Sequence, residues 1–211
     1  MSCALEANSL TDTIQLVLAS ASPRRRELLA LTGIPFLIDA PEVDESCALG
    51  ARDAVAELSR RKALAGAAMH PGMTVLASDT LVAVDDQPLG KPRDPEDAFR
   101  MLRQLSGRWH HVYTGVCVVD AHGALHCGVD ATAVHFLPMT DEEIRAYIAT
   151  GEPMDKAGSY ALQGIAGLWV DKIEGSSSNV IGLPLTLTRR LLHEAGLPVL
   201  GLSADKNDLT E

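Results

Sequence analysis

"MTVLASDTLVAVDD", residues 73–86, carries the strongest β-strand signal of the chain. Its apolar and β-branched side chains favour a buried strand, and the "DDQPLG" at its end favours a turn. The triplet 78–80, Ser-Asp-Thr, interrupts this apolar run. Aspartate is depleted in strands and rarely buried without a partner, so Asp79 is either an acceptor of backbone hydrogen bonds or a functional carboxylate. We favour the functional interpretation, as a general base or a metal ligand.

Helix and strand signals alternate irregularly on both sides of this segment. Upstream we expect a strand over residues 14–19, a helix over 23–32, a strand within 34–46 and a helix over 51–68. Downstream we expect a helix from Asp94 to Gly107, two strands around an Ala-His-Gly turn, a helix over 140–150, a glycine-rich segment at 157–182 and a helix over 184–195. Because strict βαβ alternation is missing, the pattern predicts an α/β fold with a mixed, twisted sheet flanked by helices.

The composition limits the class of protein. The 211 residues carry a formal net charge of −10, which disfavours bulk nucleic-acid binding but leaves a small anionic ligand open. The sequence shows neither a membrane span nor a signal peptide, so we expect a cytoplasmic protein. Residues 1–13 and 201–211 are expected to be a flexible leader and tail, with one domain over residues 14–200.

The four cysteines are scattered without a C-x-x-C pair, which argues against a metal cluster or a disulfide framework. Cys117 and Cys127 flank a predicted hairpin turn and could lie on neighbouring strands. We expect them to be a reduced pair rather than a disulfide, as is typical of cytosolic proteins.

The segment "ASASPRRREL" places three arginines at a predicted helix start. Such a start is the positive end of the helix dipole, where each cation is unfavourable by roughly 0.3–1 kcal/mol. Serine hydroxyls, free amides and guanidinium groups suit phosphate oxygens. Successive helical positions turn by about 100°, so we assign Ser20, Arg24 and Arg25 to an anion site and Arg26 to solvent. The alternative is a surface cluster paired with acids such as Glu27.

Two lysines extend this cationic set. Lys62 lies on the apolar stripe of its predicted helix, in register with Val55 and Leu58, so its ammonium either extends to solvent or finds an anion. Lys91 precedes a helix in "LGKPRDPED", with Arg93 two residues further on. Taken alone, this second motif is weak.

Acidic and amide side chains complete the candidate set. Glu42, Asp44 and Glu45 form an acidic loop that could give oxygen ligands to a divalent ion, although most such loops are simply solvated. Gln163 lies among glycines, and its amide can read donors and acceptors on a base edge; a plain glycine-rich turn fits equally well. Without a P-loop, G-x-S-x-G or H-E-x-x-H motif, this inventory favours metal-assisted attack of water on a phosphoanhydride.

Taken together, these segments resemble the Maf family of nucleoside triphosphate pyrophosphatases. The resemblance runs in order from about residue 16 to 185 through "LASASPRRRELL", "SRRKA", "ASDTLVAVDDQPLGKPRD", "MLRQLSGRWHHVYTGV", "EPMDKAGSYALQG" and "VIGLPL". It implies a two-lobed α/β fold related to the inosine triphosphate pyrophosphatases, with a central cleft between the lobes. It also implies a divalent metal cofactor, Mg²⁺ or Mn²⁺, and hydrolysis of a nucleoside triphosphate to the monophosphate and pyrophosphate.

The resemblance assigns roles to individual residues. Asp79 matches the family's proton acceptor and is also a candidate metal ligand. The polar and cationic cleft residues are matched by Ser20, Arg24, Arg25, Lys62 and Lys91. Glu45 matches an acidic cleft residue, for which we expect metal binding. A homodimer is implied in the same way.

Three positions concern the choice of nucleotide. Members similar to dTTP/UTP pyrophosphatases carry Arg, Thr and Gln where this chain has Arg24, Thr80 and Gln163. We therefore expect pyrimidine triphosphates, including modified ones, as substrates in the house-cleaning of nucleotide pools. A Maf enzyme acting on 7-methyl-GTP, and a nucleotide-binding regulator of septum formation with little catalysis, are the alternatives.

Overall fold

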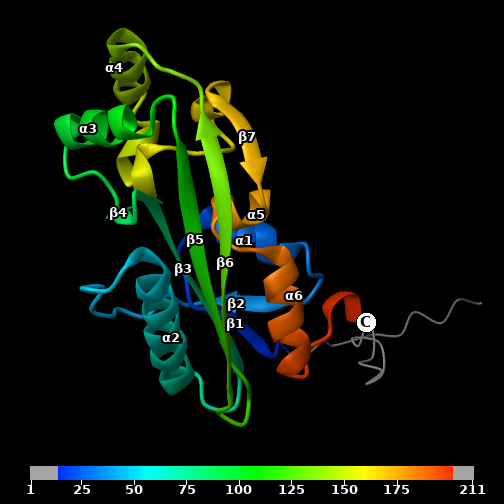
Figure 1. Ribbon diagram of the computed structural model, residues 1–211. Helices are drawn as coiled ribbons and strands as arrows, with labels where there is room; N and C mark the ends of the chain where they lie inside the picture. Colours follow the sequence, from blue (N-terminus) through cyan, green and yellow to red (C-terminus); the bar gives the residue numbers. More distant parts are fainter. Residues whose placement is uncertain (1–13, 202–211) are drawn as a thin grey trace, which may run out of the picture.

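The apolar segment around Asp79 forms β3 (Thr74–Val84), the strand on which the sheet is built. Figure 1 shows the computed structural model, which describes residues 14–201. The sheet has seven strands in the order β2-β1-β3-β5-β6-β7, with β4 paired to β3. The other strands are β1 (Leu16–Leu18), β2 (Phe36–Ile38), β4 (Gln87–Leu89), β5 (Trp109–Val119), β6 (Leu125–Phe136) and β7 (Val170–Glu174).

Both strand orientations occur in this sheet. β1 pairs in parallel with β2 and β3, whereas β3, β5, β6 and β7 pair antiparallel in succession. The prediction of a mixed α/β sheet rather than a doubly wound parallel one is therefore confirmed.

Local capping chemistry sets the starts of three predicted helices. Ser22, Asp94 and Thr140 each accept a hydrogen bond from the backbone N–H three residues later, and proline opens the first two helices. The helices are α1 (Pro23–Ala30), α2 (Ala51–Met69), α3 (Pro95–Leu105), α4 (Asp141–Ala149), α5 (Ser177–Ile181) and α6 (Leu185–Glu194). No helix in the described part of the chain is long and apolar enough to cross a bilayer.

The buried apolar side chains form separate groups along the long strands. At one end, α3 and α4 pack on β3, β5 and β6 through residues such as Leu102 and Phe136. Toward the other end, α2 covers one face of the sheet, and α1 and α6 cover the opposite face through residues such as Leu29 and Leu192. The stretch of β3 that carries Asp79 lies between these groups.

One edge of β3 is left open at this point. On that edge, β1 pairs with residues 74–76 and β4 pairs with residues 82–84, and neither strand reaches residues 77–81. The other edge pairs with β5 throughout, including Asp79 with Gly115. Successive side chains of a strand point to opposite faces of the sheet. At this gap no neighbouring strand separates the two faces, so the side chains of Asp79 and Thr80 border the same opening.

Gly115 allows α2 to approach the sheet closely. A Cβ atom at this position would lie 2.2 Å from the carbonyl oxygen of Val55 and 2.8 Å from Oγ of Ser59, both on α2. The absence of a side chain therefore brings α2, with Lys62 on it, against the strand pair that carries Asp79.

Several details differ from the sequence expectations. The expected turn after β3 is confined to Asp85 and Asp86, both with positive φ, and is followed by β4. The glycine-rich segment 157–182 also contains β7 and α5, whose five residues each give little periodic signal. The leader 1–13 and most of the tail lie outside the described residues.

The expectation of reduced cysteines is wrong for Cys117 and Cys127, which form a disulfide. The strand register explains it: the two residues are direct partners in the β5–β6 ladder, and their Cα atoms are 4.1 Å apart. Directly opposite residues of an antiparallel pair lie close enough for a bridge. Cys47 is free.

We predict that Gly115→Ala destabilises the protein. The added methyl group must push α2 away from β5, an overpacking effect that typically lowers the free energy of unfolding by about 1–3 kcal/mol. Urea denaturation measures this as a lower midpoint. Gly90→Ala is the control, because a Cβ there meets open space. Equal midpoints for the two variants would contradict the close-packing argument.

Candidate active site

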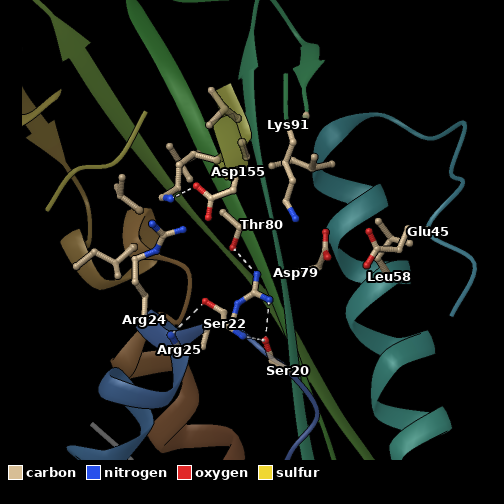
Figure 2. Close-up of a pocket in the computed structure, with 18 of the residues that line it drawn as sticks. Ser20, Ser22, Arg24, Arg25, Glu45, Leu58, Asp79, Thr80, Lys91 and Asp155 are labelled. Atoms are coloured by element: carbon tan, nitrogen blue, oxygen red, sulfur yellow. Dashed lines mark hydrogen bonds and ion pairs between the residues drawn. The ribbon is translucent and has the colours of Figure 1, made fainter. Parts of the chain in front are cut away.

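A cavity of about 1040 Å³ opens at the unpaired edge of β3 (Figure 2). It lies beyond the carboxyl end of β1, the usual position of ligands in open α/β sheets. The segments that line it include parts of α1, α2 and α5 and the chain between residues 155 and 163. All nine predicted site residues line it: Ser20, Arg24, Arg25, Glu45, Lys62, Asp79, Thr80, Lys91 and Gln163.

The junction between β1 and α1 fixes Arg25. Its Nε donates to the carbonyl oxygen of Gly182 at 3.0 Å, and its two terminal nitrogens donate to Oγ of Ser20 at 3.3 Å and Oγ1 of Thr80 at 3.2 Å. Burial lowers the pKa of Arg25, and the nearby Asp79 carboxylate opposes this effect. The guanidinium group is thus a held, partly desolvated cation facing the cavity.

Thr80 belongs to a hydrogen-bond chain that supports Arg25. Thr114 donates its hydroxyl proton to the carbonyl oxygen of Asn179 at 2.9 Å, so its oxygen accepts from Thr80 at 3.0 Å. Thr80 in turn accepts from Arg25. The hydroxyl proton of Thr80 is therefore taken up by Thr114, and the hydroxyl oxygen of Thr80 holds the guanidinium of Arg25.

The three arginines of α1 separate as the helical spacing predicts. Arg24 and Arg25 line the cavity, whereas Arg26 is exposed and does not. Figure 2 shows Arg24 reaching from α1 toward the carboxylate of Asp155. The pKa of Asp155 is lowered by a hydrogen bond from Lys156 and, to a smaller extent, by Arg24.

Lys62 meets two carboxylates on the other side of the cavity. Its Nζ lies 2.6 Å from Oδ1 of Asp79 and 2.7 Å from Oε1 of Glu45. Of the two alternatives that the sequence left open for this lysine, the structure shows the one in which it finds an anion. The Lys62 hydrogen bond is the main reason that the pKa of Glu45 is lowered, with a smaller contribution from Lys91.

Lys91 approaches the same carboxylates from the loop after β4. Figure 2 shows its amino group pointing toward Asp79. Within residues 14–201, the side chains of Lys91 and Arg24 make neither a hydrogen bond nor an ion pair. Their positive charges remain available to an anion in the cavity.

Other candidates lie away from the cavity. Asp44 accepts hydrogen bonds from the backbone and the hydroxyl of Ser46, and neither it nor Glu42 lines the cavity. Arg93 forms an ion pair with Asp97 and does not line the cavity. Only Glu45 of the predicted acidic loop therefore reaches the site.

The structure adds residues to which the sequence analysis gave no role. Asp155, Lys156 and Tyr160 line the cavity beside Gln163. All four come from the segment "EPMDKAGSYALQG", which was singled out as a motif. The motif thus carried the signal, but a sequence does not show which of its side chains face a cavity.

The fold and the site together define an α/β protein with a cationic, carboxylate-containing cavity at a sheet edge. The family described as "Maf-like protein" matches residues 15–195, and the chain belongs to this Maf family. The family resemblance predicted from the motifs is therefore confirmed.

Curated relatives are similar over almost their full lengths. The dTTP/UTP pyrophosphatase of Sphingopyxis alaskensis is 52% identical over 187 residues, which cover 87% of this chain and 98% of the relative. Those of Vibrio cholerae and Myxococcus xanthus are 51% and 50% identical, with 85% and 89% of this chain covered and 97% and 96% of the relatives.

Solved structures show a partial likeness. The Ham1 protein of Staphylococcus aureus gives a TM-score of 0.45 at 14% identity, over 57% of this chain and 71% of that one. A nucleoside-triphosphatase, the dITP/XTP pyrophosphatase of Mycobacterium abscessus, gives 0.39 at 19% identity, over 59% and 74%.

We predict that Arg25→Ala and Arg26→Ala differ sharply in anion binding. Removing Arg25 deletes charged hydrogen-bond donors at the cavity and should weaken binding of inorganic tripolyphosphate by about tenfold or more. Arg26→Ala should bind within about twofold of the parent, since a solvated charge contributes little. Isothermal titration calorimetry measures both affinities. Equal losses would contradict the helical assignment.

Proposed function

We propose that the protein hydrolyses dTTP and UTP to the nucleoside monophosphate and pyrophosphate. The observation that carries this proposal is the cluster at the open edge of β3, where Asp79 lies among Arg25, Lys62 and Lys91. A carboxylate among cations suits a water that must attack a polyanion. Relatives at about 50% identity named dTTP/UTP pyrophosphatase support the same activity.

The reaction divides between the two kinds of side chain. A water oxygen forms a bond to the α-phosphorus, and the bond from that phosphorus to the oxygen bridging the α- and β-phosphates breaks. Asp79 accepts a proton from the attacking water, as a general base. Pyrophosphate leaves with the electron pair of the broken bond, and the cavity's cations stabilise the charge that develops there.

Ser20 and Arg25 have a distinct task in this reaction. The hydrogen bonds from Arg25 to Gly182, Ser20 and Thr80 fix the guanidinium before a ligand arrives. A donor that is already positioned need not reorganise during the reaction, which is the main source of electrostatic stabilisation in such sites. Arg24 and Lys91 provide further positive charge at the cavity wall.

A divalent cation fits the carboxylates that are present. Glu45 and Asp79 converge on one ammonium nitrogen, so their oxygens are close to a common point. The described residues show no group of three or more His, Cys, Asp or Glu side chains able to hold a metal. Mg²⁺ is commonly bound by one or two carboxylates together with substrate phosphates. Glu45 and Asp79 would hold Mg²⁺ or Mn²⁺, which when bound supplies charge neutralisation at the phosphates.

The choice of base is assigned to the glycine-rich segment that carries Gln163. Gln163 carries an amide that can both donate to and accept from a pyrimidine edge. Arg24 lines the same cavity. Thr80 contributes through Arg25, to which it is hydrogen-bonded.

We also propose a homodimer that acts on nucleotide pools in the cytoplasm. The family resemblance supports the dimer. The outermost strand β2 exposes Leu37 and Ile38, which are candidates for the contact between the two copies. Light scattering would test the dimer as a molar mass twice that of one chain. The net charge of −10 supports a small nucleotide rather than bulk nucleic acid as the partner.

The substrate proposal is tested by measuring phosphate release from dTTP, UTP, 7-methyl-GTP and GTP with added inorganic pyrophosphatase and Mn²⁺. We expect dTTP and UTP to give the highest kcat/KM. Highest turnover of 7-methyl-GTP would assign the protein to another substrate class. Tight binding of nucleotides without turnover would instead indicate a regulator.

We predict that Asp79→Asn lowers kcat for dTTP by about 10²–10⁴-fold, the usual contribution of a general base. An amide cannot accept the proton of the attacking water. Steady-state kinetics over a Mn²⁺ titration measure this loss. A higher Mn²⁺ requirement in the variant would add a ligand role for Asp79.

The matched control is Asp86→Asn, an exposed turn residue with positive φ, a conformation that asparagine also tolerates. It should retain the parent kcat. Full activity of Asp79→Asn would refute both roles of Asp79.

A further inference from the structure

The loop that presents Gln163 to the cavity is attached at both ends to one pair of side chains. At its start, the backbone N–H of Ala161 donates to the phenol oxygen of Tyr147 at 3.3 Å. At its end, the backbone N–H of Ile165 donates to Oε2 of Glu152 at 3.1 Å. The phenol of Tyr147 donates to Oε1 of Glu152 at 2.8 Å. Tyr147 and Glu152 therefore form a clamp around residues 161–165.

The phenol of Tyr147 is a hydrogen-bond donor in this clamp. Burial raises the pKa of Tyr147, and its hydrogen bond to Glu152 raises it further, so the phenol keeps its proton. Only 2% of Tyr147 is exposed, and its ring packs in the core formed with α3. Tyr147 thus anchors the clamp to α4, whereas Glu152 lies in the short 3-10 turn Glu152–Asp155 that follows this helix.

Gly164 is shaped to accept the carboxylate. A Cβ atom at this position would lie 2.4 Å from the carboxyl carbon and both oxygens of Glu152. The N–H of Gly164 also donates to the carbonyl oxygen of Ala161 at 3.0 Å, which closes the turn. Glu152 therefore occupies a space that this glycine leaves for it.

Gln163 lies at the turn between the two attachment points. It lines the cavity, is exposed, and makes no hydrogen bond of its own within residues 14–201. Its position therefore depends on the backbone of the loop. That backbone is held by Glu152, whose own carboxylate does not line the cavity.

We propose that Glu152 is a positioning residue for nucleobase selection. By holding the backbone of residues 161–165, it fixes the position of the Gln163 amide and so its distance to the base. This inference rests on the proposed function, in which Gln163 reads a pyrimidine. Hydrogen bonds weaken steeply when their distance or angle departs from the optimum, so a displaced loop would weaken the contact between Gln163 and the base. Glu152 is predicted to act on the base and not on the phosphates, because its contacts are with the loop of Gln163 and not with Arg25, Lys62 or Lys91.

The test variant is Glu152→Gln, which preserves the side-chain volume. Both groups that face the carboxylate, the Tyr147 hydroxyl and the Ile165 N–H, are donors. A glutamine offers them one oxygen and one NH₂ group: with the oxygen on Ile165, the NH₂ group competes with the Ala161 N–H for the Tyr147 oxygen, and with the NH₂ group on Ile165 that contact becomes donor against donor. One attachment of the loop is then lost. Glu142→Gln, an exposed substitution on α4, is the matched control.

The expected result is a selective one. In Glu152→Gln, the ratio of kcat/KM for dTTP to that for CTP should fall by about tenfold, through KM for dTTP. Binding of inorganic tripolyphosphate, which has no base, should stay within about twofold of the parent, as should kcat for dTTP. Glu142→Gln should match the parent in every measurement. Tyr147→Phe should give the same loss of selectivity, and the double variant no more than the larger single loss, because both act on one loop.

Other outcomes overturn the inference and identify what failed. Unchanged selectivity in both variants, or a loss of tripolyphosphate binding parallel to a lower melting temperature, would show that the clamp only supports the fold. Parent selectivity in Gln163→Ala would show that Gln163 does not read the base. A parent protein inactive on every nucleotide would refute the proposed function itself, which is measured first.

Discussion

The unequal pairing of β3 is the constraint on which the site depends. One edge of this strand is satisfied by β5 along its length, whereas β1 and β4 leave residues 77–81 open on the other edge. An unpaired strand edge would ordinarily be a liability. Here it forms the wall of a cavity, and Asp79 and Thr80, which point to opposite faces, both reach that cavity. A fully paired sheet would have separated them by the thickness of the sheet.

The electrostatics of the cavity follow from this placement. Lys62 reaches Asp79 because Gly115 lets α2 lie close to the sheet, and Arg25 reaches Thr80 from α1 on the other face. Cations from both faces thus converge on one opening, with two carboxylates among them. Three arginines at a helix start are unfavourable for an isolated helix, and the cavity explains why they are present. Two of them face an anion site, and the third is solvated.

The sequence predicted these features where the signal is local. Helix phasing separated Arg24 and Arg25 from Arg26, and capping residues located the starts of α1, α3 and α4. The prediction of reduced cysteines failed because the pairing of cysteines depends on strand register. Cys117 and Cys127 occupy directly opposite positions on β5 and β6 and form a disulfide. Short, exposed elements such as β7 also escaped, because their apolar period is too brief to detect.

By itself, then, the sequence determined the mixed α/β class, the Maf family and the chemical inventory of the site. Those properties reside in ordered motifs, spacing and side-chain type. The tertiary structure alone decided which groups are in contact: that Lys62 binds Asp79 and Glu45, that Thr80 holds Arg25, and that Glu152 clamps the loop of Gln163. Each of these contacts joins separate elements of the chain. Its distance is set by how closely backbones pack, and no local pattern encodes that quantity.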